Sequence, residues 1–283
     1  MNLVDVAIIF EKKKEKILRE IHSDNNPVAI LLGGQPAAGK SSLTDRVIED
    51  HPNKKFLIVN GDRYRVYHPE HEEIIKDSIT YSEKTQSFSN VFTEKLIEES
   101  AKHKFNIIVE GTMRNKNTTL KTAKFFKDAG FGVEAYIISA PALFTEIGIY
   151  NRYQYEVNLI GFGRLADIVV HNNAVEGLLL SADALYNQNV VDKISIYSFL
   201  AKEKIQDYNN DGKKWNCNFA PSIVIKTSRE KQLKDTLLLS QIIKAGEETL
   251  ELMTEEILKN SINQTLKKLK IQKRQLFNEN VES

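Results

Sequence analysis

The chain has 283 residues with 39 Lys and Arg against 38 Asp and Glu, and its net charge is +1. A hydrophobic fraction of 41% and a charged fraction of 27% are ordinary for a globular protein, and the balanced charge gives no reason to expect a nucleic-acid or membrane-surface partner. We see no signal peptide, no apolar run near the roughly 20 residues that cross a bilayer, and one cysteine, Cys217, which excludes an intrachain disulfide. We therefore expect a cytoplasmic protein.

The predicted elements alternate between helix and strand along the chain. An amphipathic helix is expected over residues 4–22. The predicted strands cover residues 28–32, 55–60, 106–110, 133–138 and 192–197. The predicted helices cover residues 71–103, 118–129, 150–158 and 166–180, and Gly130 is a typical stop signal for the second of them. This alternation predicts an α/β fold, a parallel sheet with right-handed crossovers and flanking helices.

The composition changes after about Ser228. Residues 229–272 are rich in Lys, Glu, Leu and Ile at helical spacing, which predicts a pair of terminal helices. We divide the chain into a main α/β domain over residues 1–228 and a helical C-terminal extension over residues 229–283. A structural cap on the core is favoured for the extension over a partner-binding arm.

One motif is complete. Residues 34–41 match G-x-x-x-x-G-K-[ST], between the first predicted α/β strand and a helix-compatible run, which is the context that a phosphate-binding P-loop requires. Backbone N–H groups and the helix N-terminus would bind phosphate, Lys40 would reach the β- and γ-phosphates, and the Ser41 hydroxyl would bind Mg²⁺. The residues expected to contact the nucleotide are Gly34, Gln35, Pro36, Ala37, Ala38, Gly39, Lys40, Ser41 and Ser42. This motif predicts binding of a nucleoside triphosphate, with ATP and Mg²⁺ as cofactors.

A carboxylate follows the second predicted strand. Asp62 lies at its carboxyl end, on the edge of a parallel sheet where ligands bind, and we place this strand next to that of the P-loop. An Asp in this position can orient and deprotonate a hydroxyl that receives phosphate. The alternative is an ordinary turn residue. The cations and aromatic residues of 63–69 favour an anionic acceptor.

Two further signals follow. Glu110 ends the strand over 106–110 as the acid of a Walker B strand does, and it could contact the magnesium shell or the acceptor. Arg152 and Arg164 flank a glycine break at 161–163, where lid arginines of small kinases neutralise transferred phosphate. The alternative for both arginines is a solvated helix surface.

The joint pattern resembles the zeta toxins of bacterial toxin–antitoxin systems. The matching segments are Gly33–Ser41, Asn60-x-Asp62 with His68-Pro69, Val109–Thr112, Arg152-Tyr153, and Arg164 followed by His171. The resemblance covers roughly residues 28–180. It implies a P-loop kinase fold, ATP-dependent phosphorylation of the 3′-hydroxyl of UDP-N-acetylglucosamine, and inhibition by a small helical antitoxin protein.

The resemblance also implies roles for single residues. Asp62 would be the catalytic base, while Lys40, Arg152 and Arg164 would act on the phosphates. The substrate-binding residues that it implies are Ser89, Asn90, Glu94, Glu110, Thr112 and Arg114. The sequence departs from the family pattern at Ala37-Ala38, at 165–167, at Asn172 and at Met113, which bears on the acceptor more than on the donor.

Other functions stay open at this point. A kinase of another small metabolite or nucleotide, such as NAD or an antibiotic, would share the same donor site. A GTP-dependent switch should carry a guanine-reading motif ending in Asp, and residues 115–118 lack it. A non-catalytic antitoxin-like partner would not need Lys40, Ser41 and Asp62 together.

Overall fold

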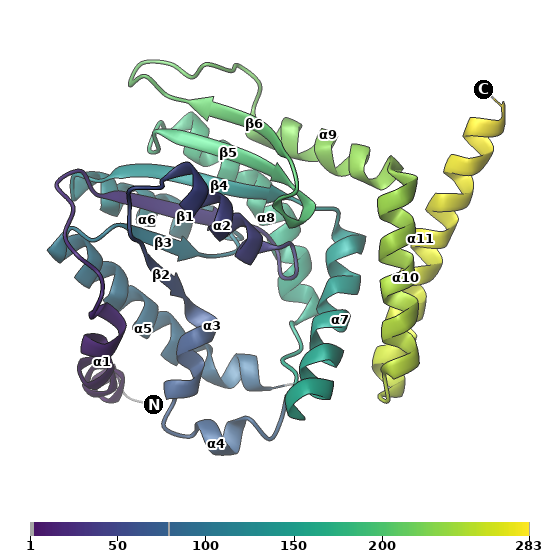
Figure 1. Ribbon diagram of the computed structural model, residues 1–283, viewed down its shortest axis with the longest axis horizontal. Coiled ribbons are helices and arrows are strands. Elements are labelled where there is room, and N and C mark those ends of the chain that lie inside the picture. Colours follow the sequence, from purple (N-terminus) through teal and green to yellow (C-terminus); the bar gives the residue numbers. More distant parts are fainter. Residues whose placement is uncertain (1–2, 79, 283) are drawn as a thin grey trace.

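A six-stranded sheet forms the centre of the computed structural model, which describes residues 3–78 and 80–282 (Figure 1). Its strand order is β2-β3-β1-β4-β5-β6, and the first five strands are parallel while β6 runs antiparallel to β5. The strands are β1 Val28–Gly33, β2 Leu57–Asn60, β3 Ile107–Glu110, β4 Gly132–Ser139, β5 Lys193–Ser198 and β6 Lys204–Asn209. The strands before β6 are short apolar runs, as buried parallel strands are.

Helices cover both faces of this sheet. They are α1 Leu3–Leu18, α2 Lys40–Asp50, α3 Gly61–Tyr64, α4 His71–Ile74, α5 Tyr81–His103, α6 Lys116–Asp128, α7 Ala142–Ile160, α8 Ile168–Asn187, α9 Pro221–Lys234, α10 Thr236–Leu252 and α11 Glu256–Glu282, with 3₁₀ turns η1 Arg65–Tyr67 and η2 Phe199–Ala201. Alternate residues of β1 point into opposite hydrophobic cores. Leu31 belongs to the core that α1, α5, α6 and α8 help to form, and Leu32 belongs to the core that α2, α7, α10 and α11 help to form. Because successive side chains of a strand point to opposite faces, both faces of the sheet are buried under helices. The molecule therefore has three layers, with the sheet between two layers of helices.

The predicted α/β fold is confirmed, with differences in detail. β3 lies between β1 and β2, so the strand that carries Asp62 is not the neighbour of the P-loop strand, as we expected. The crossover from β1 to β2 leaves a place between them, which β3 fills later in the chain. The order of strands along a sequence does not reveal such a gap. β6 was not predicted, because 204–209 is polar and forms an antiparallel edge strand by pairing with β5.

Helix bounds also differ from the prediction. α7 begins at Ala142, eight residues before the predicted start at 150, since its first turns are largely apolar and buried on all sides and so give no helical period. Gly130 does end α6, with φ of 76° in the left-handed region.

The C-terminal region forms three helices, where a pair was expected. α9 begins before the predicted boundary, and position 228 lies within it, while α10 and α11 form an antiparallel hairpin beside α7 (Figure 1). A Cβ at Gly246 would lie 2.7 Å from Leu266 and 3.1 Å from Ile147, so glycine allows the hairpin to pack closely. The division into domains at 228 stays a prediction. In the described residues no helix is long and apolar enough to cross a membrane.

Candidate active site

The P-loop connects β1 to α2 at the carboxyl edge of the sheet. Gly39 has φ of 103°, and a Cβ there would lie 2.6 Å from the Cα of Leu200, so both conformation and space require glycine. The N–H of Leu200 donates to the carbonyl of Ala38 at 3.0 Å. The amide of Gln35 donates to the carbonyl of Ala140 at 2.8 Å. These contacts hold the loop open ahead of the N-terminus of α2, the arrangement that binds phosphate.

Lys40 is the first residue of α2, and its side chain turns back over the loop. Its Nζ donates to the carbonyls of Gly34 at 3.0 Å and Gln35 at 3.3 Å. Burial lowers the pKa of Lys40 to about 8, against the opposing charges of Glu110 and Asp62. A buried, weakly compensated ammonium is the group that a phosphate would stabilise.

Asp62 lies in the first turn after β2. Asn60 caps this turn by accepting the N–H of Asp62 on its side-chain oxygen at 2.9 Å. The Oδ1 of Asp62 accepts from Arg65 Nε at 3.0 Å and from Arg164 Nη1 at 2.6 Å. Burial alone would raise the pKa of Asp62, but the charges of Arg164 and Arg65 outweigh it and lower the pKa. Asp62 is therefore a carboxylate, and 43% of its side chain stays exposed to a ligand.

Glu110 ends β3 and faces the same edge. Its Oε2 accepts from Asn60 Nδ2 at 2.7 Å, which joins the ends of β3 and β2. Burial raises the pKa of Glu110, while the charges of Lys40 and Arg63 oppose the shift. Arg63 is exposed beside this pair. Glu110 is the last residue of β3, which lies between β1 and β2. It therefore lies between Lys40 and the turn that carries Asp62.

Arg152 and Arg164 both contact one glutamate, Glu156. Arg152 lies on α7, and its Nε is 3.8 Å from Oε1 of Glu156. Glu156 Oε2 accepts the backbone N–H of Arg164 at 2.9 Å. Burial lowers the pKa of Arg152, and the charge of Arg164 adds to this shift. The Nε and Nη2 of Arg152 are buried and have no hydrogen-bond partner.

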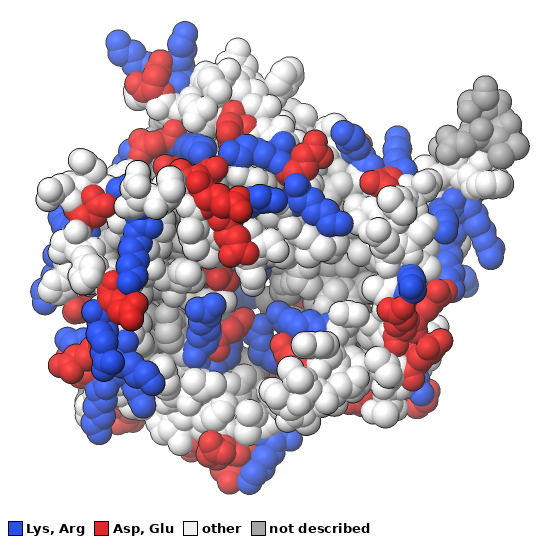
Figure 2. Space-filling model, in the orientation of Figure 1, with Lys and Arg blue, Asp and Glu red and all other residues white. Residues whose placement is uncertain are grey.

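These residues fit the predicted cofactors. Buried N–H donors without a partner are costly unless a ligand or water binds them, so Arg152 fits a phosphate beside the P-loop. Ser41 lies in the first turn of α2 with its side chain exposed, as an Mg²⁺ ligand requires. Among the residues described, no group of three His, Cys, Asp or Glu that could hold a metal ion occurs. Figure 2 shows charged side chains around a hollow between α3 and α7.

The predicted acceptor residues are less tightly assembled. Ser89 is buried, and its hydroxyl donates to the carbonyl of Gly61 at 2.7 Å. Asn90 and Glu94 lie one turn apart on the exposed side of α5. In the described part of the chain, Glu94 forms no hydrogen bond or ion pair with the side chains of Lys40, Asp62 or Glu110. Thr112 and Arg114 follow β3, and the Thr112 hydroxyl accepts the N–H of Arg114 at 3.4 Å.

Sequence reasoning gave no individual role to three contributors to this edge. Arg65, counted there only among the cations of residues 63–69, is buried against α5 and bonds to Asp62. Glu156 lies four residues after Arg152 on a helix, and this spacing could have indicated their contact. Thr145 hydrogen bonds to Gln35 at 3.3 Å and to His171 Nε2 at 2.8 Å, which ties the P-loop to α7 and α8, and no sequence pattern marks it.

A glycine-rich loop that joins a parallel strand to a helix, with its lysine among carboxylates and arginines, defines a P-loop phosphate-binding protein. The family model described as Zeta toxin matches residues 12–213, and the chain belongs to this family. The family resemblance seen in the sequence is therefore confirmed.

Relatives agree with this membership. The chain is 24% identical over 267 residues to Toxin zeta of Enterococcus hirae, covering 91% of this chain and 87% of the relative. It is 29% identical over 181 residues to Toxin PezT of Streptococcus pneumoniae serotype 4, covering 62% of this chain and 70% of the relative.

Solved structures agree on the fold. One from the PezAT chromosomal toxin–antitoxin system of Streptococcus pneumoniae has a TM-score of 0.74 at 22% identity, covering 89% of this chain and 98% of that chain. One of AvrRxo1-ORF1 and -ORF2 with ATP has a TM-score of 0.52 at 13% identity, covering 96% and 86%.

Proposed function

We propose that this protein is an ATP- and Mg²⁺-dependent kinase that phosphorylates a hydroxyl of a nucleotide sugar, the 3′-hydroxyl of UDP-N-acetylglucosamine. One observation carries the proposal: Asp62, a carboxylate on the exposed edge, lies within electrostatic range of Lys40, Arg152 and Arg164. A candidate base and a set of phosphate-binding cations therefore share one site. A switch protein needs the cations but has no use for an oriented base.

The residues divide into a donor and an acceptor side. The backbone of 34–39, Lys40 and Ser41 would hold ATP with its Mg²⁺, which supplies charge neutralisation for the transferred phosphoryl group. Arg152 and Arg164 would bind the oxygens of that group, since their charge is worth most in a buried site. Asp62 would orient the acceptor hydroxyl and take its proton.

The acceptor side would use Glu110, Thr112 and Arg114 after β3, and Ser89, Asn90 and Glu94 on α5. Ser89 is already bonded to the backbone of Gly61, so its contribution would be to place the turn that carries Asp62. Exposed Asn90 and Glu94 are free to contact a sugar.

We also propose that the protein acts in the cytoplasm as the toxin of a toxin–antitoxin pair. Solved neighbours that come from such pairs, including PezAT, support a second protein as partner. A small helical antitoxin would have to cover the P-loop side of the molecule to prevent ATP binding.

A substrate panel tests the proposal. Purified protein is incubated with ATP, Mg²⁺ and each of several nucleotide sugars, with NAD and aminoglycosides as other acceptors, and products are read by mass. We expect a mass gain of one phosphate on UDP-N-acetylglucosamine with wild type and none with Asp62→Asn. Transfer to another acceptor alone would refute the substrate and keep the kinase, while no transfer with intact ATP binding would refute both.

A further inference from the structure

The candidate base is held unequally by its two oxygens. Two hydrogen bonds to the Asp62 side chain, from Arg65 and Arg164, reach Oδ1. Within the described residues Oδ2 accepts no hydrogen bond. A carboxylate can accept a proton only on an oxygen that its neighbours leave accessible, and so Oδ2 is the atom that can meet a hydroxyl.

The two arginines differ in how firmly they are fixed. The Arg65 side chain is 5% exposed, and its remaining donors bond to the carbonyl of Ser82 at 2.8 Å, Thr85 Oγ1 at 2.7 Å and Gln86 Oε1 at 2.8 Å. Arg164 is 19% exposed, and within the described residues its side chain makes one hydrogen bond, to Asp62. Arg65 is therefore a permanent partner of the carboxylate, whereas Arg164 can exchange Asp62 for another anion at little cost.

The bonds of Arg65 continue toward the acceptor side. Gln86, which accepts from Arg65, donates its own Nε2 to Asn90 Oδ1 at 2.6 Å. Asn90 lies on the exposed face of α5 together with Glu94. The planar Arg65 guanidinium thus links Asp62, by way of Gln86, to Asn90 on the polar face of α5, 28 residues further along the chain. The link is rigid because the donors of a guanidinium have a fixed geometry.

We propose that Arg65 is a positioning residue of the transfer reaction: it fixes Asp62 so that Oδ2 faces the acceptor hydroxyl, and it sets the register of the acceptor-binding face of α5. This inference rests on the proposed kinase function. α3 has four residues and cannot hold the carboxylate by itself. Arg65 supplies the rigidity from α5, a helix of 23 residues.

Arg65 also affects the charge state of the base. The charged groups that face Asp62 are Arg65, Arg164, Arg152, Lys40 and Glu110. Burial favours the neutral acid, and the arginines keep the pKa of Asp62 low. When Arg164 moves to a phosphate, Arg65 is the remaining bonded cation. Its loss should therefore shift the acid limb of the pH–rate profile to higher pH.

The experiment compares Arg65→Met with Arg65→Lys and with Arg229→Met. Arg229 is another buried arginine, on α9, and its Nη1 donates to the carbonyl of Val175 outside the site. We expect Arg65→Met to lower kcat by about 10²-fold, as misplacement of a reacting group does, while ATP affinity measured by titration stays unchanged. Arg65→Lys should restore the acid limb but not kcat, because an ammonium lacks the fork. Arg229→Met, which also removes a buried guanidinium, should not move the profile.

A second variant keeps the test clear of folding effects. Gln86→Leu cuts the link to Asn90 but leaves the bond between Arg65 and Asp62, so the KM for the acceptor should rise while kcat is nearly kept. An unchanged kcat in Arg65→Met, or a loss of kcat matched by a loss of ATP affinity, would overturn the proposal.

The positioning role can be separated from the proposed function. ¹³C NMR titration of the Asp62 carboxyl reports its pKa without any substrate. A higher pKa in Arg65→Met than in wild type supports the link, and an equal pKa contradicts it. If wild type transfers phosphate to no acceptor, the kinase function fails while this titration still decides whether Arg65 controls Asp62.

Discussion

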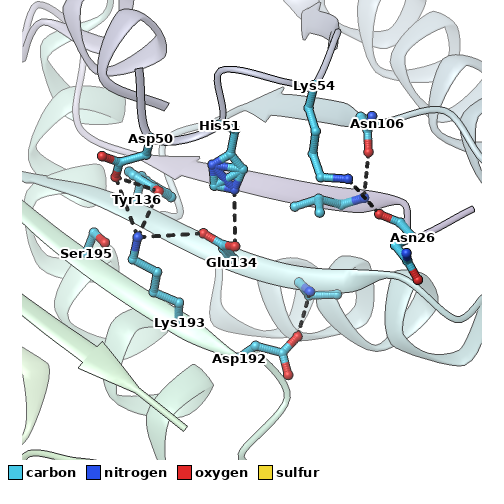
Figure 3. Close-up of polar contacts among 12 residues, drawn as sticks. Asn26, Asp50, His51, Lys54, Asn106, Glu134, Tyr136, Asp192, Lys193 and Ser195 are labelled. Atoms are coloured by element: carbon cyan, nitrogen blue, oxygen red, sulfur yellow. Dashed lines mark hydrogen bonds and ion pairs between the residues drawn. The ribbon is translucent and has the colours of Figure 1, made fainter. Parts of the chain in front are cut away.

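The two edges of the sheet both carry clusters of charge, but only one cluster balances its own charges. At the amino edge, Lys193 lies among Asp50, Glu134 and the Tyr136 hydroxyl, and His51 bonds to Glu134 at 3.2 Å (Figure 3). Lys204 lies 3.2 Å from Asp50, so that two lysines face two carboxylates there. At the carboxyl edge, Lys40 and the arginines outnumber the carboxylates around them. Buried atoms without a hydrogen bond within the described residues occur at both edges, Nε and Nη2 of Arg152 at one and Glu134 Oε2 and His51 Nδ1 at the other.

This difference distinguishes structure from function. Complementary charges that are bonded to one another contribute to the fold and have little capacity left for a ligand. Cations in excess over the carboxylates around them keep capacity for an anionic ligand, which can also complete unsatisfied donors among them. Mutations at the amino edge should therefore change stability, and those at the carboxyl edge should change activity.

The largest expected effect is at the carboxyl edge. Asp62→Asn keeps the size and the Oδ1 acceptor of the side chain but cannot take a proton, so we expect kcat to fall about 10³-fold. ATP affinity should be nearly unchanged. Phosphate transfer and nucleotide titration measure the two separately. Near-normal turnover would show that another group is the base, and Lys40→Ala is the control that should lose affinity and activity together.

A second test removes the incomplete group itself. Arg152→Met deletes buried donors without partners, so we expect transfer to fall about 10²-fold while the Tm stays equal or rises. Thermal unfolding and transfer assays on one preparation check both. A large drop in Tm would mean that Arg152 is structurally satisfied, and the contrast between the edges would fail.

The amino edge should respond in the opposite way. Lys193→Met leaves Glu134 without a lysine partner, while Asp50 keeps Lys204 at 3.2 Å, and since Lys193 is 21% exposed we expect a loss of about 1–2 kcal/mol in unfolding free energy. Denaturant titration measures it, and kcat should not change. Glu134→Gln in the Lys193→Met background should recover part of the loss, because it removes the uncompensated carboxylate.

The last test concerns the pH dependence of stability. Lys40 has a pKa of about 8 in the folded protein against 10.5 for the ordinary side chain. Between these values the unfolded chain binds a proton that the folded chain does not, so folding stability contributed by this group rises with pH from 8 to 10.5. Its destabilising contribution is fully present below pH 8. Nucleotide-free wild type should show this slope in Tm relative to Lys40→Met, and parallel curves would contradict it.

The sequence was most informative where local pattern decides the outcome. The P-loop and the strands up to β5 follow from short apolar runs, a fixed motif and glycine signals, and each appears close to its predicted place. Strand order and β6 do not follow from local pattern, because they depend on pairing between distant segments.

The same limit applies within the site. Motif spacing indicated Lys40, Asp62 and Glu110, and the structure brings them to one edge. The role of Arg65 depends on residues 82–86 of another helix, and the contact between Arg164 and Asp62 spans 102 residues. Such contacts exist only after the chain has folded, so no local spacing predicts them.

The contact of Leu200 with the P-loop has a consequence for synthesis. Ala38 is translated long before Leu200, yet its carbonyl accepts the N–H of Leu200, and Gln35 relies on Ala140. A growing chain therefore contains the whole phosphate-binding motif well before the loop can take its final shape. We expect a chain truncated after residue 192 to keep every motif residue and bind no nucleotide. We therefore expect phosphate binding only after Leu200 has been added to the growing chain.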